Sequence, residues 1–336
     1  MQIGSQAAPR PVVLDRAREW GRHHPGAVAG AAVAAIALAL IVGEGLQATA
    51  QQTVNGLVSG SYFALGAVGL TLVYGILKLV NFAHGDMLTF GGYMAFLVNV
   101  TLGMPLAVAL VLAVAATAAL GVAFEVGLWG PMRRKRAGML QLLLISIGLA
   151  FIIRNGIQFV AGTDTKRLDV NRTAAIEFLG LQIGRTELIV VVVGSAVLVA
   201  IGAMLRFSSI GKQMRALSDD IALAETTGID TRRVVVITWI FAAGAAGLAG
   251  VLVTAAIGVL TPNLGFFLLL SLFAATILGG IGNAYGALAG GLMIGLAQEW
   301  ATLLIEARWK VAVGFVVLIC VLIVRPQGIF GRSRTV

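Results

Sequence analysis

The side chains of this sequence that could do chemistry are polar residues set inside long apolar stretches. Asn81, His84 and Asp86 lie within six residues of one another in the segment LVNFAHGDMLTFGGYM. Such groups are costly wherever an apolar stretch crosses a membrane, and they are often functional. An imidazole close to a carboxylate could carry protons. We favour a structural role for His84, which could be solvated or bond a backbone carbonyl, over contact with a substrate.

A second group of polar candidates comprises Asn283 and Tyr285 in LGGIGNAYGALAGGLM, and Ser59 and Tyr62 in an earlier apolar run. We expect Asn81 and Asn283 to satisfy backbone groups that helix breaks set free. Both segments place Asn close to a small residue and Gly, and matched interruptions in two halves are typical of transport sites. We therefore hypothesise an internal repeat that pairs these two segments; the alternative is that Gly-rich turns look alike.

Patterns of catalytic and metal-binding residues are missing from the sequence. There is no HExxH and no CxxC, and His23, His24 and His84 do not share a segment, so we predict no metal site. A buried apolar role suits Cys320, the single cysteine, better than reactivity. The GxxxxGK[ST] phosphate loop is also missing. We predict that the chain is not an enzyme and binds no cofactor of its own.

The elements that position these residues are predicted from the apolar runs. The 336 residues are 59% hydrophobic and 12% charged, whereas soluble domains are about 45–50% apolar and about 25% charged. We predict an all-α, polytopic membrane bundle of about 8–10 transmembrane helices. The stretch 266–302 is ambiguous, and we prefer two short crossings or a broken helix there. The expected spans are 27–46, 53–76, 86–101, 105–129, 139–161, 186–206, 233–258, 266–279, 284–302 and 309–325.

The basic residues predict how the chain lies in the membrane. The net charge is +9 and the basic residues cluster between the apolar runs, which indicates membrane topology rather than nucleic-acid binding. Ten crossings would place the clusters and both termini on the cytoplasmic side, with 162–185 outside. The predicted parts are a cytoplasmic tail at 1–25, a transmembrane domain at 26–325 and a second tail at 326–336.

Two charged residues lie within the predicted spans themselves. Glu125 and Arg154 fall in the fourth and fifth spans, near opposite ends by this topology. We therefore expect no ion pair between them. Each is predicted to face the bundle interior or to extend its charged end toward the membrane surface.

The longest polar segment between spans, 206–232, is predicted to form one or two short amphipathic helices on the cytoplasmic face. Apolar or small residues recur at Met214, Leu217, Ile221 and Ala224, at the spacing of one helical face. A helix held between two spans has the right shape to transmit a push from a soluble partner; the alternative is an ordinary surface helix. The predicted contact residues are Gly211, Arg215, Ala216, Asp219, Asp220, Ala224, Gly228 and Ile229.

We predict different roles for these contact residues. We expect Arg215 and Asp220 to make a polar contact, and Ala216 and Ala224 to pack into a groove of the partner. Gly228 can end the helix in a left-handed conformation. The competing interpretation is that Asp219 and Asp220 only cap a helix.

This pattern resembles the cytoplasmic coupling loop of permease subunits in bacterial ATP-binding cassette importers. Three further segments resemble the branched-chain amino acid permease family, which also includes urea permeases. They are GLVSGSYFALGAVGLTLVYGILKLVNFAHGDM (56–87), ATILGGIGNAYGALAGGLMIGLAQE (275–299) and VRPQGIFG (324–331). The resemblance covers about residues 52–331, while the amino-terminal extension departs from the shortest family members.

The resemblance implies a multi-pass protein of a bacterial or archaeal inner membrane. It implies two cytoplasmic ATP-binding subunits, a second related permease subunit and a periplasmic or lipid-anchored solute-binding protein as partners. ATP would be used by those ATPase subunits and not by this chain. Branched-chain amino acids are the leading substrate, with urea or amides, or a self-contained secondary transporter or channel, as alternatives.

Overall fold

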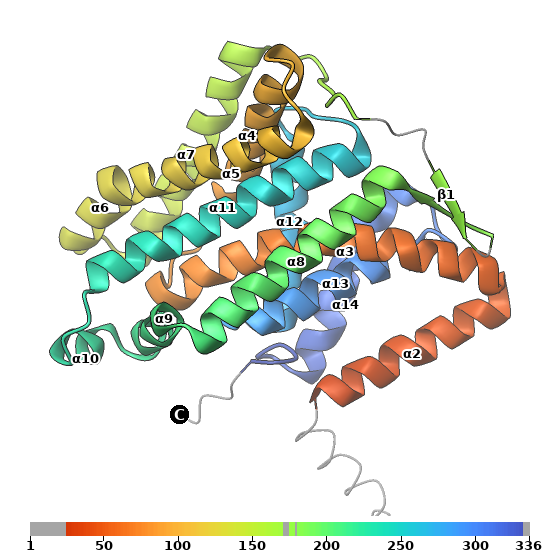
Figure 1. The fold of residues 1–336 in the computed structure, drawn as a ribbon. Helices are drawn as coiled ribbons and strands as arrows, with labels where there is room; N and C mark the ends of the chain where they lie inside the picture. The colour runs from red at the N-terminus through yellow and green to blue at the C-terminus, as the bar shows by residue number, and fades with distance from the viewer. Residues whose placement is uncertain (1–24, 171–174, 179, 332–336) are drawn as a thin grey trace, which may run out of the picture.

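The computed structural model describes residues 25–170, 175–178 and 180–331. Nearly all of the predicted tail at 1–25 therefore lies outside the described residues, as does the end of the predicted tail at 326–336. The described chain is a helical bundle with one small hairpin (Figure 1), which confirms the all-α polytopic prediction. Seven helices in the described part of the chain are long and apolar enough to cross a membrane.

Most helices follow the predicted apolar runs to within a few residues, but α3 begins at Leu46, seven residues before the predicted 53–76. The stretch 266–302 forms two helices, separated by a turn that contains the left-handed Gly280 and Gly282. The helices are α2 (Pro25–Glu44), α3 (Leu46–Leu77), α4 (His84–Phe96), α5 (Leu106–Phe124), α6 (Gly130–Arg134), α7 (Met139–Ala161), α8 (Arg185–Phe207), α9 (Ser209–Asp219), α10 (Ile221–Thr226), α11 (Thr231–Ile257), α12 (Leu264–Gly279), α13 (Ala284–Ala301) and α14 (Lys310–Val324). Short π-helical turns, Leu97–Thr101 and Glu125–Trp129, extend α4 and α5, and a 3-10 turn, Ala307–Trp309, precedes α14.

Two long helices, α3 and α11, form the centre of the bundle. They pack against each other, and α13 also lies along α3 (Figure 1). Glycine permits this closeness: an ideal Cβ on Gly295 of α13 would lie 2.3 Å from the backbone nitrogen of Gly60 on α3. Helices at the periphery, such as α2 and α14, instead expose apolar side chains. That is the surface that a hydrocarbon environment requires.

The chain contains an inverted repeat with an offset of 180 residues. The central helix α3 ends at Lys78 and α11 ends at Gly258, both left-handed (φ 52° and 74°). A six-residue link follows each, 78–83 and 258–263, and each leads into a short helix, α4 or α12. The packing repeats as well, because α4 lies on α11 and α5 as α12 lies on α3 and α13.

This repeat is not the one hypothesised from the sequence, which paired the two Gly-Asn segments. The counterpart of the link before α4 is 258–263, whereas the turn at 280–283 joins α12 to α13. The two Gly-Asn strings look alike because helix breaks of any kind use the same turn residues. The repeated feature is the backbone conformation, and the side chains of the two links differ.

The segment between α7 and α8 holds a β-hairpin that sequence reasoning missed. Strands β1 (Ala175–Phe178) and β2 (Leu181–Gly184) pair antiparallel, with Glu177 opposite Gln182. Gln51 of α3 holds β2: its Nε2 donates to the Gln182 carbonyl, and its Oε1 accepts from the Gln182 backbone N–H, both at 2.9 Å. We call this end of the bundle the hairpin end.

The opposite end carries α6, α9, α10 and the last described residues (Figure 1). We call it the basic end, since α6, α9 and the chain next to them carry the arginines and lysines of residues 133–136, 206–215 and 232–233. It is also where α3 finishes, because Ser218 of α9 bonds the Gly75 carbonyl of α3. The two links of the repeat therefore start from opposite ends of the bundle.

Candidate functional site

The amino-terminal ends of α4 and α12 meet inside the bundle. An ideal Cβ on Gly265 would lie 1.7 Å from the Gly85 carbonyl oxygen, and one on Gly85 would lie 2.4 Å from the Gly265 oxygen. The backbone N–H of Gly265 donates to Thr89 Oγ1 at 2.8 Å. We call this contact the crossing. Only residues without a side chain permit two backbones to approach so closely.

His84 and Asn81 secure the link that leads into α4. His84 is 1% exposed, and its Nε2 lies 2.9 Å from the Gly66 carbonyl oxygen of α3, so this nitrogen carries the proton that it donates. Of the two structural expectations for His84, the structure shows the backbone bond and not solvation. Asn81 Oδ1 accepts from the Ala83 N–H at 3.1 Å, which is the backbone role expected for it.

Asp86, in the first turn of α4, forms a buried ion pair with Arg154 of α7. Arg154 Nε and Nη2 donate to the two carboxylate oxygens at 2.9 and 3.1 Å. The Asp86 side chain is fully buried and that of Arg154 is 12% exposed. The guanidinium also lies 4.4 Å from the ring centre of Phe266 on α12. The pair thus joins both helices of the crossing to α7.

The predicted absence of a Glu125–Arg154 pair holds, but each residue has a partner that the sequence did not reveal. Glu125 pairs with Arg133, one turn past the π-helical segment. Arg154 pairs with Asp86 from 68 positions away. The expectation that Arg154 faces the bundle interior is met through this bond.

Ser59 and Tyr62 belong to a separate polar cluster around Glu299 of α13. Ser59 Oγ donates to Glu299 Oε1 at 2.8 Å, and Tyr62 Oη donates to Ser59 Oγ at 3.2 Å. Lys310, at the start of α14, donates to Glu299 Oε2 at 2.7 Å. Sequence reasoning missed Glu299 and Lys310, although a carboxylate inside a predicted apolar span was a usable signal.

Asn283 and Tyr285 lie at the basic end, away from the crossing. Asn283 Oδ1 accepts from the N–H groups of Tyr285 and Gly286 at 3.1 and 3.2 Å, which caps α13. Its Nδ2 donates to the Phe330 carbonyl at 3.0 Å. Tyr285 Oη donates to the Gly202 carbonyl of α8 at 2.7 Å. These bonds hold the end of the bundle together.

The predicted amphipathic segment forms α9 and α10 at the basic end. Gly211, Met214 and Leu217 are buried against the bundle. An ideal Cβ on Gly211 would lie 2.4 Å from the Leu205 carbonyl oxygen, so glycine lets α9 fold back tightly on the end of α8. Arg215 donates a hydrogen bond to the same carbonyl. Two predicted contact residues thus position α9.

The structure revises the faces assigned to this segment. Ala224 is 3% exposed and packs within its own chain, so it is not accessible to the groove of a partner. Ala216 is half-buried. Asp220 caps α10, since its Oδ1 accepts from the Leu223 N–H at 3.0 Å. The exposed apolar side chains are Ile221 at 42% and Leu223 at 64%. Ile221 was predicted to share the buried face, and Leu223 was missed.

The remaining members of the segment form its exit. Gly228 is left-handed (φ 83°) and ends α10. The Ile229 N–H then donates to the Ala224 carbonyl at 3.2 Å. Asp219 is the exposed last residue of α9, so of the two predicted caps the structure shows Asp220 in that role. Asp230 caps α11.

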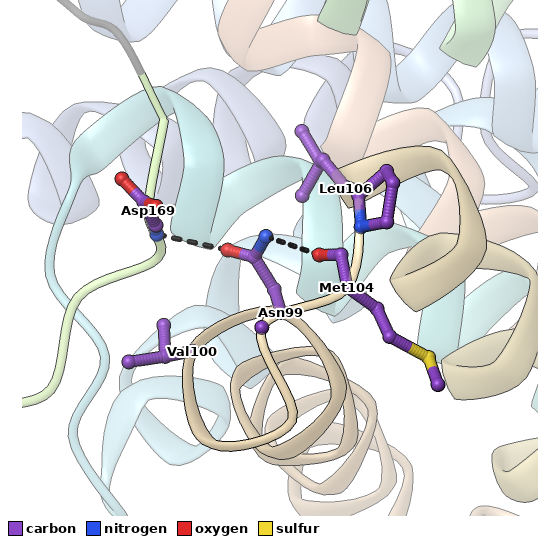
Figure 2. Close-up of a pocket in the computed structure, with 7 residues that line it drawn as sticks. Asn99, Val100, Met104, Leu106 and Asp169 are labelled. Atoms are coloured by element: carbon purple, nitrogen blue, oxygen red, sulfur yellow. Dashed lines mark hydrogen bonds between the residues drawn. The ribbon is translucent and has the colours of Figure 1, made fainter.

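A pocket of 440 Å³ opens at the hairpin end between the end of α4 and the segment 162–170. Asn99 lies at its centre (Figure 2): its Nδ2 donates to the Met104 carbonyl at 3.0 Å, and its Oδ1 accepts from the Asp169 N–H at 2.9 Å. Asn99 therefore fastens the segment 162–170, which we call the outer segment, to the loop after α4.

Comparison with known proteins gives one family. The family model described as "Branched-chain amino acid transport system / permease component" matches residues 52–322. The chain is 32% identical over 297 residues to the high-affinity branched-chain amino acid transport permease LivH of Escherichia coli K12, covering 84% of this chain and 96% of LivH. BraD of Pseudomonas aeruginosa matches with the same identity and coverage.

A second kind of relative is more distant. The permease LivM of Escherichia coli K12 is 26% identical over 301 residues, covering 81% of this chain and 68% of LivM. No solved structure matches the chain.

Proposed function

The chain belongs to the family of branched-chain amino acid transport permeases, since the family model matches residues 52–322. On this basis we propose that the chain forms a solute pathway and that separate ATPase subunits drive transport through it. The solute is a branched-chain amino acid, as the names of LivH and BraD state for those proteins. The comparisons favour this substrate over urea or amides, and favour a permease subunit over a self-contained carrier or channel.

The observation that carries the proposal is the surface of α9 and α10. Their inward face is fully used by the bundle, while Ile221 and Leu223 remain 42% and 64% exposed beside the exposed Asp219. We interpret these exposed apolar side chains, on a polar segment outside the membrane helices, as part of a contact with a protein partner. A cytoplasmic ATP-binding subunit fits here, since a rigid pair of short helices transmits a push into α8 and α11.

The placement of partners follows from the two ends of the bundle. The basic clusters at residues 133–136, 206–215 and 232–233 lie at the basic end. By the positive-inside rule we propose that this end, with both termini, is cytoplasmic. The two ATPase subunits would bind there. The solute-binding protein would dock at the hairpin end, on the other side of the membrane. Since LivH and LivM relatives both occur in Escherichia coli K12, we propose a second, related permease as the pathway's other half.

Within the chain, we propose that the crossing closes the pathway. Asn81, His84 and Asp86 shape the link and helix on one side of it, and Arg154 fixes their position. Ser59, Tyr62, Asn283 and Tyr285 lie in bonded clusters away from the crossing. We propose that these four hold the helices that border the pathway.

The test replaces the exposed apolar surface of α10. Leu223→Glu should abolish co-purification of the ATPase subunits from native membranes, while the chain remains in the membrane at its normal level. Thr226→Ala on the same short helix is the matched control, because Thr226 is exposed and its hydroxyl bonds only within α10. Co-purification that survives Leu223→Glu would remove α10 from the coupling contact. If no ATPase subunit co-purifies with the unchanged chain, even after crosslinking, the proposal itself is overturned.

A further inference from the structure

Resting on the proposed coupling to ATPases, we propose that Ser218 and Lys78 are positioning residues that connect α9 to the crossing. Both act at the point where α3 ends. Ser218 Oγ donates to the Gly75 carbonyl at 3.0 Å. Lys78 Nζ donates to the same carbonyl at 2.6 Å and to the Ser218 carbonyl at 3.4 Å.

This set of bonds ties three parts of the chain at one place. Beside Gly75 lies Gly282 of the turn between α12 and α13, close enough for an ideal Cβ on Gly75 to contact it at 3.5 Å. The Gly282 N–H donates to Thr71 Oγ1 at 3.1 Å, one helical turn before Gly75. A displacement of α9 therefore acts on the end of α3 and on both halves of the repeat.

From this point the chain leads directly to the crossing. Lys78 is left-handed, and its backbone N–H donates to the Tyr74 carbonyl at 2.9 Å, which fixes the direction of the link 78–83. The link is short and its far end is anchored by His84 on Gly66. Gly85 of the crossing follows at once. A shift at Lys78 thus has few residues in which it could be absorbed before it reaches Gly85.

The other half of the repeat is tied in the same way to the opposite end. In the link 258–263, Leu260 exchanges two backbone hydrogen bonds with Lys166, both at 2.9 Å. Lys166 belongs to the outer segment, which Asn99 also holds through Asp169. One link is therefore fastened to α9 and the other to the outer segment, and they lead to the two sides of one contact.

The two sets of bonds would therefore transmit different motions to the crossing. Motion of α9 reaches the crossing through Ser218, Lys78 and Gly85, whereas motion of the outer segment reaches it through Leu260 and Gly265. The alternative is that the Ser218 and Lys78 bonds only stabilise the basic end. The two cases differ in coupling: loosening a transmission element wastes ATP, whereas loosening a merely structural element lowers ATP hydrolysis and transport together.

The test measures ATP hydrolysed per solute imported by the complete transporter in proteoliposomes. Ser218→Ala removes one bond of the tie, and Ser209→Ala on the exposed side of α9 is its matched control. Lys78→Met keeps the stem and the backbone conformation but removes the ammonium bonds. We expect Ser218→Ala to raise the ratio about fivefold, the factor that one net hydrogen bond is worth, and Lys78→Met, which removes two bonds, to raise it at least as much. Ser218→Thr, which keeps the hydroxyl, should restore the normal ratio.

Two results separate the failure of this inference from failure of the proposed function. If ATP hydrolysis and import fall in proportion in Ser218→Ala and Lys78→Met, the ratio is unchanged and the tie is only structural. If the unchanged chain imports the solute without ATPase subunits, the proposed function fails and the tie has no ATPase to serve.

Discussion

The crossing makes a sharp prediction for Gly265→Ala. Its added Cβ would lie 1.7 Å from the Gly85 carbonyl oxygen and 2.4 Å from the Gly85 carbonyl carbon. Both are backbone atoms of a helix that is itself packed on α11 and α5, so they cannot rotate away as a side chain would. Overpacking in a well-packed core costs about 1–3 kcal/mol, and an immovable neighbour places this variant near the upper figure.

The matched control is Gly148→Ala in the middle of α7. Gly148 is exposed and its Cβ would meet no atom within 4 Å. Alanine in a helix interior is favoured over glycine by about 1 kcal/mol, so this variant should be slightly more stable than the unchanged chain. The two substitutions are chemically identical, and they should therefore differ by about 3–4 kcal/mol in opposite directions.

Thermal unfolding of the purified chain in mild detergent measures this difference. At about 2 °C per kcal/mol for a large domain, Gly265→Ala should melt roughly 6–8 °C below Gly148→Ala. A single symmetric peak at the same elution volume in size-exclusion chromatography would show that both variants are monodisperse before heating. If the two variants melt at the same temperature, the backbones of α4 and α12 do not touch at these glycines and the crossing is misplaced.

Three further predictions concern other parts of the chain. Asp86→Asn should destabilise the chain by about 3–5 kcal/mol because it leaves the Arg154 charge buried and unpaired, whereas Asp86→Leu with Arg154→Met should cost less; the two melting curves decide this. Gly228→Val should abolish ATP-driven uptake while membrane levels persist, because valine opposes the left-handed backbone (φ 83°) by about 1–2 kcal/mol; uptake at the normal rate would contradict it. Gln51→Ala should expose the hairpin 175–184 to protease faster than Gln52→Ala, since Gln51 makes both bonds to Gln182; equal digestion rates would exclude this anchoring.

The apolar runs were sufficient to predict where the long helices lie, because apolar stretches of about 20 residues form the helices that cross a membrane. They did not predict where each helix ends, since α3 begins at Leu46, seven residues before the predicted span at 53–76. They could not predict the partners of charged residues. Arg154 and Asp86 are separated by 68 positions, and only the packing of α7 on α4 brings them together. The sequence signal for Asp86 was its presence near a span, which predicts that it has a partner but not which one.

Side-chain patterns were also insufficient for the surface of α10. Spacing alone placed Ile221 on the buried face with Met214 and Leu217, as a single continuous helix would. Asp220 has extended backbone and starts a new helix, so the phase changes there and Ile221 turns outward. The sequence also allows Asp220 to cap a helix, and a cap at this position predicts the break between α9 and α10.

The Asp86–Arg154 pair also bears on how the chain is made. The helix α4 and its π-helical extension cover only residues 84–101, slightly fewer than the ~20 that span a bilayer. The Asp86 carboxylate does not meet Arg154 until α7 has been synthesised. At about 5–20 residues per second, the 68 positions between them take about 3–14 s to translate. During that interval the unpaired Asp86 makes it costly for α4 to lie in lipid alone. We therefore expect the first half of the bundle to enter the bilayer as a group, with α4 completed by the helices that follow it.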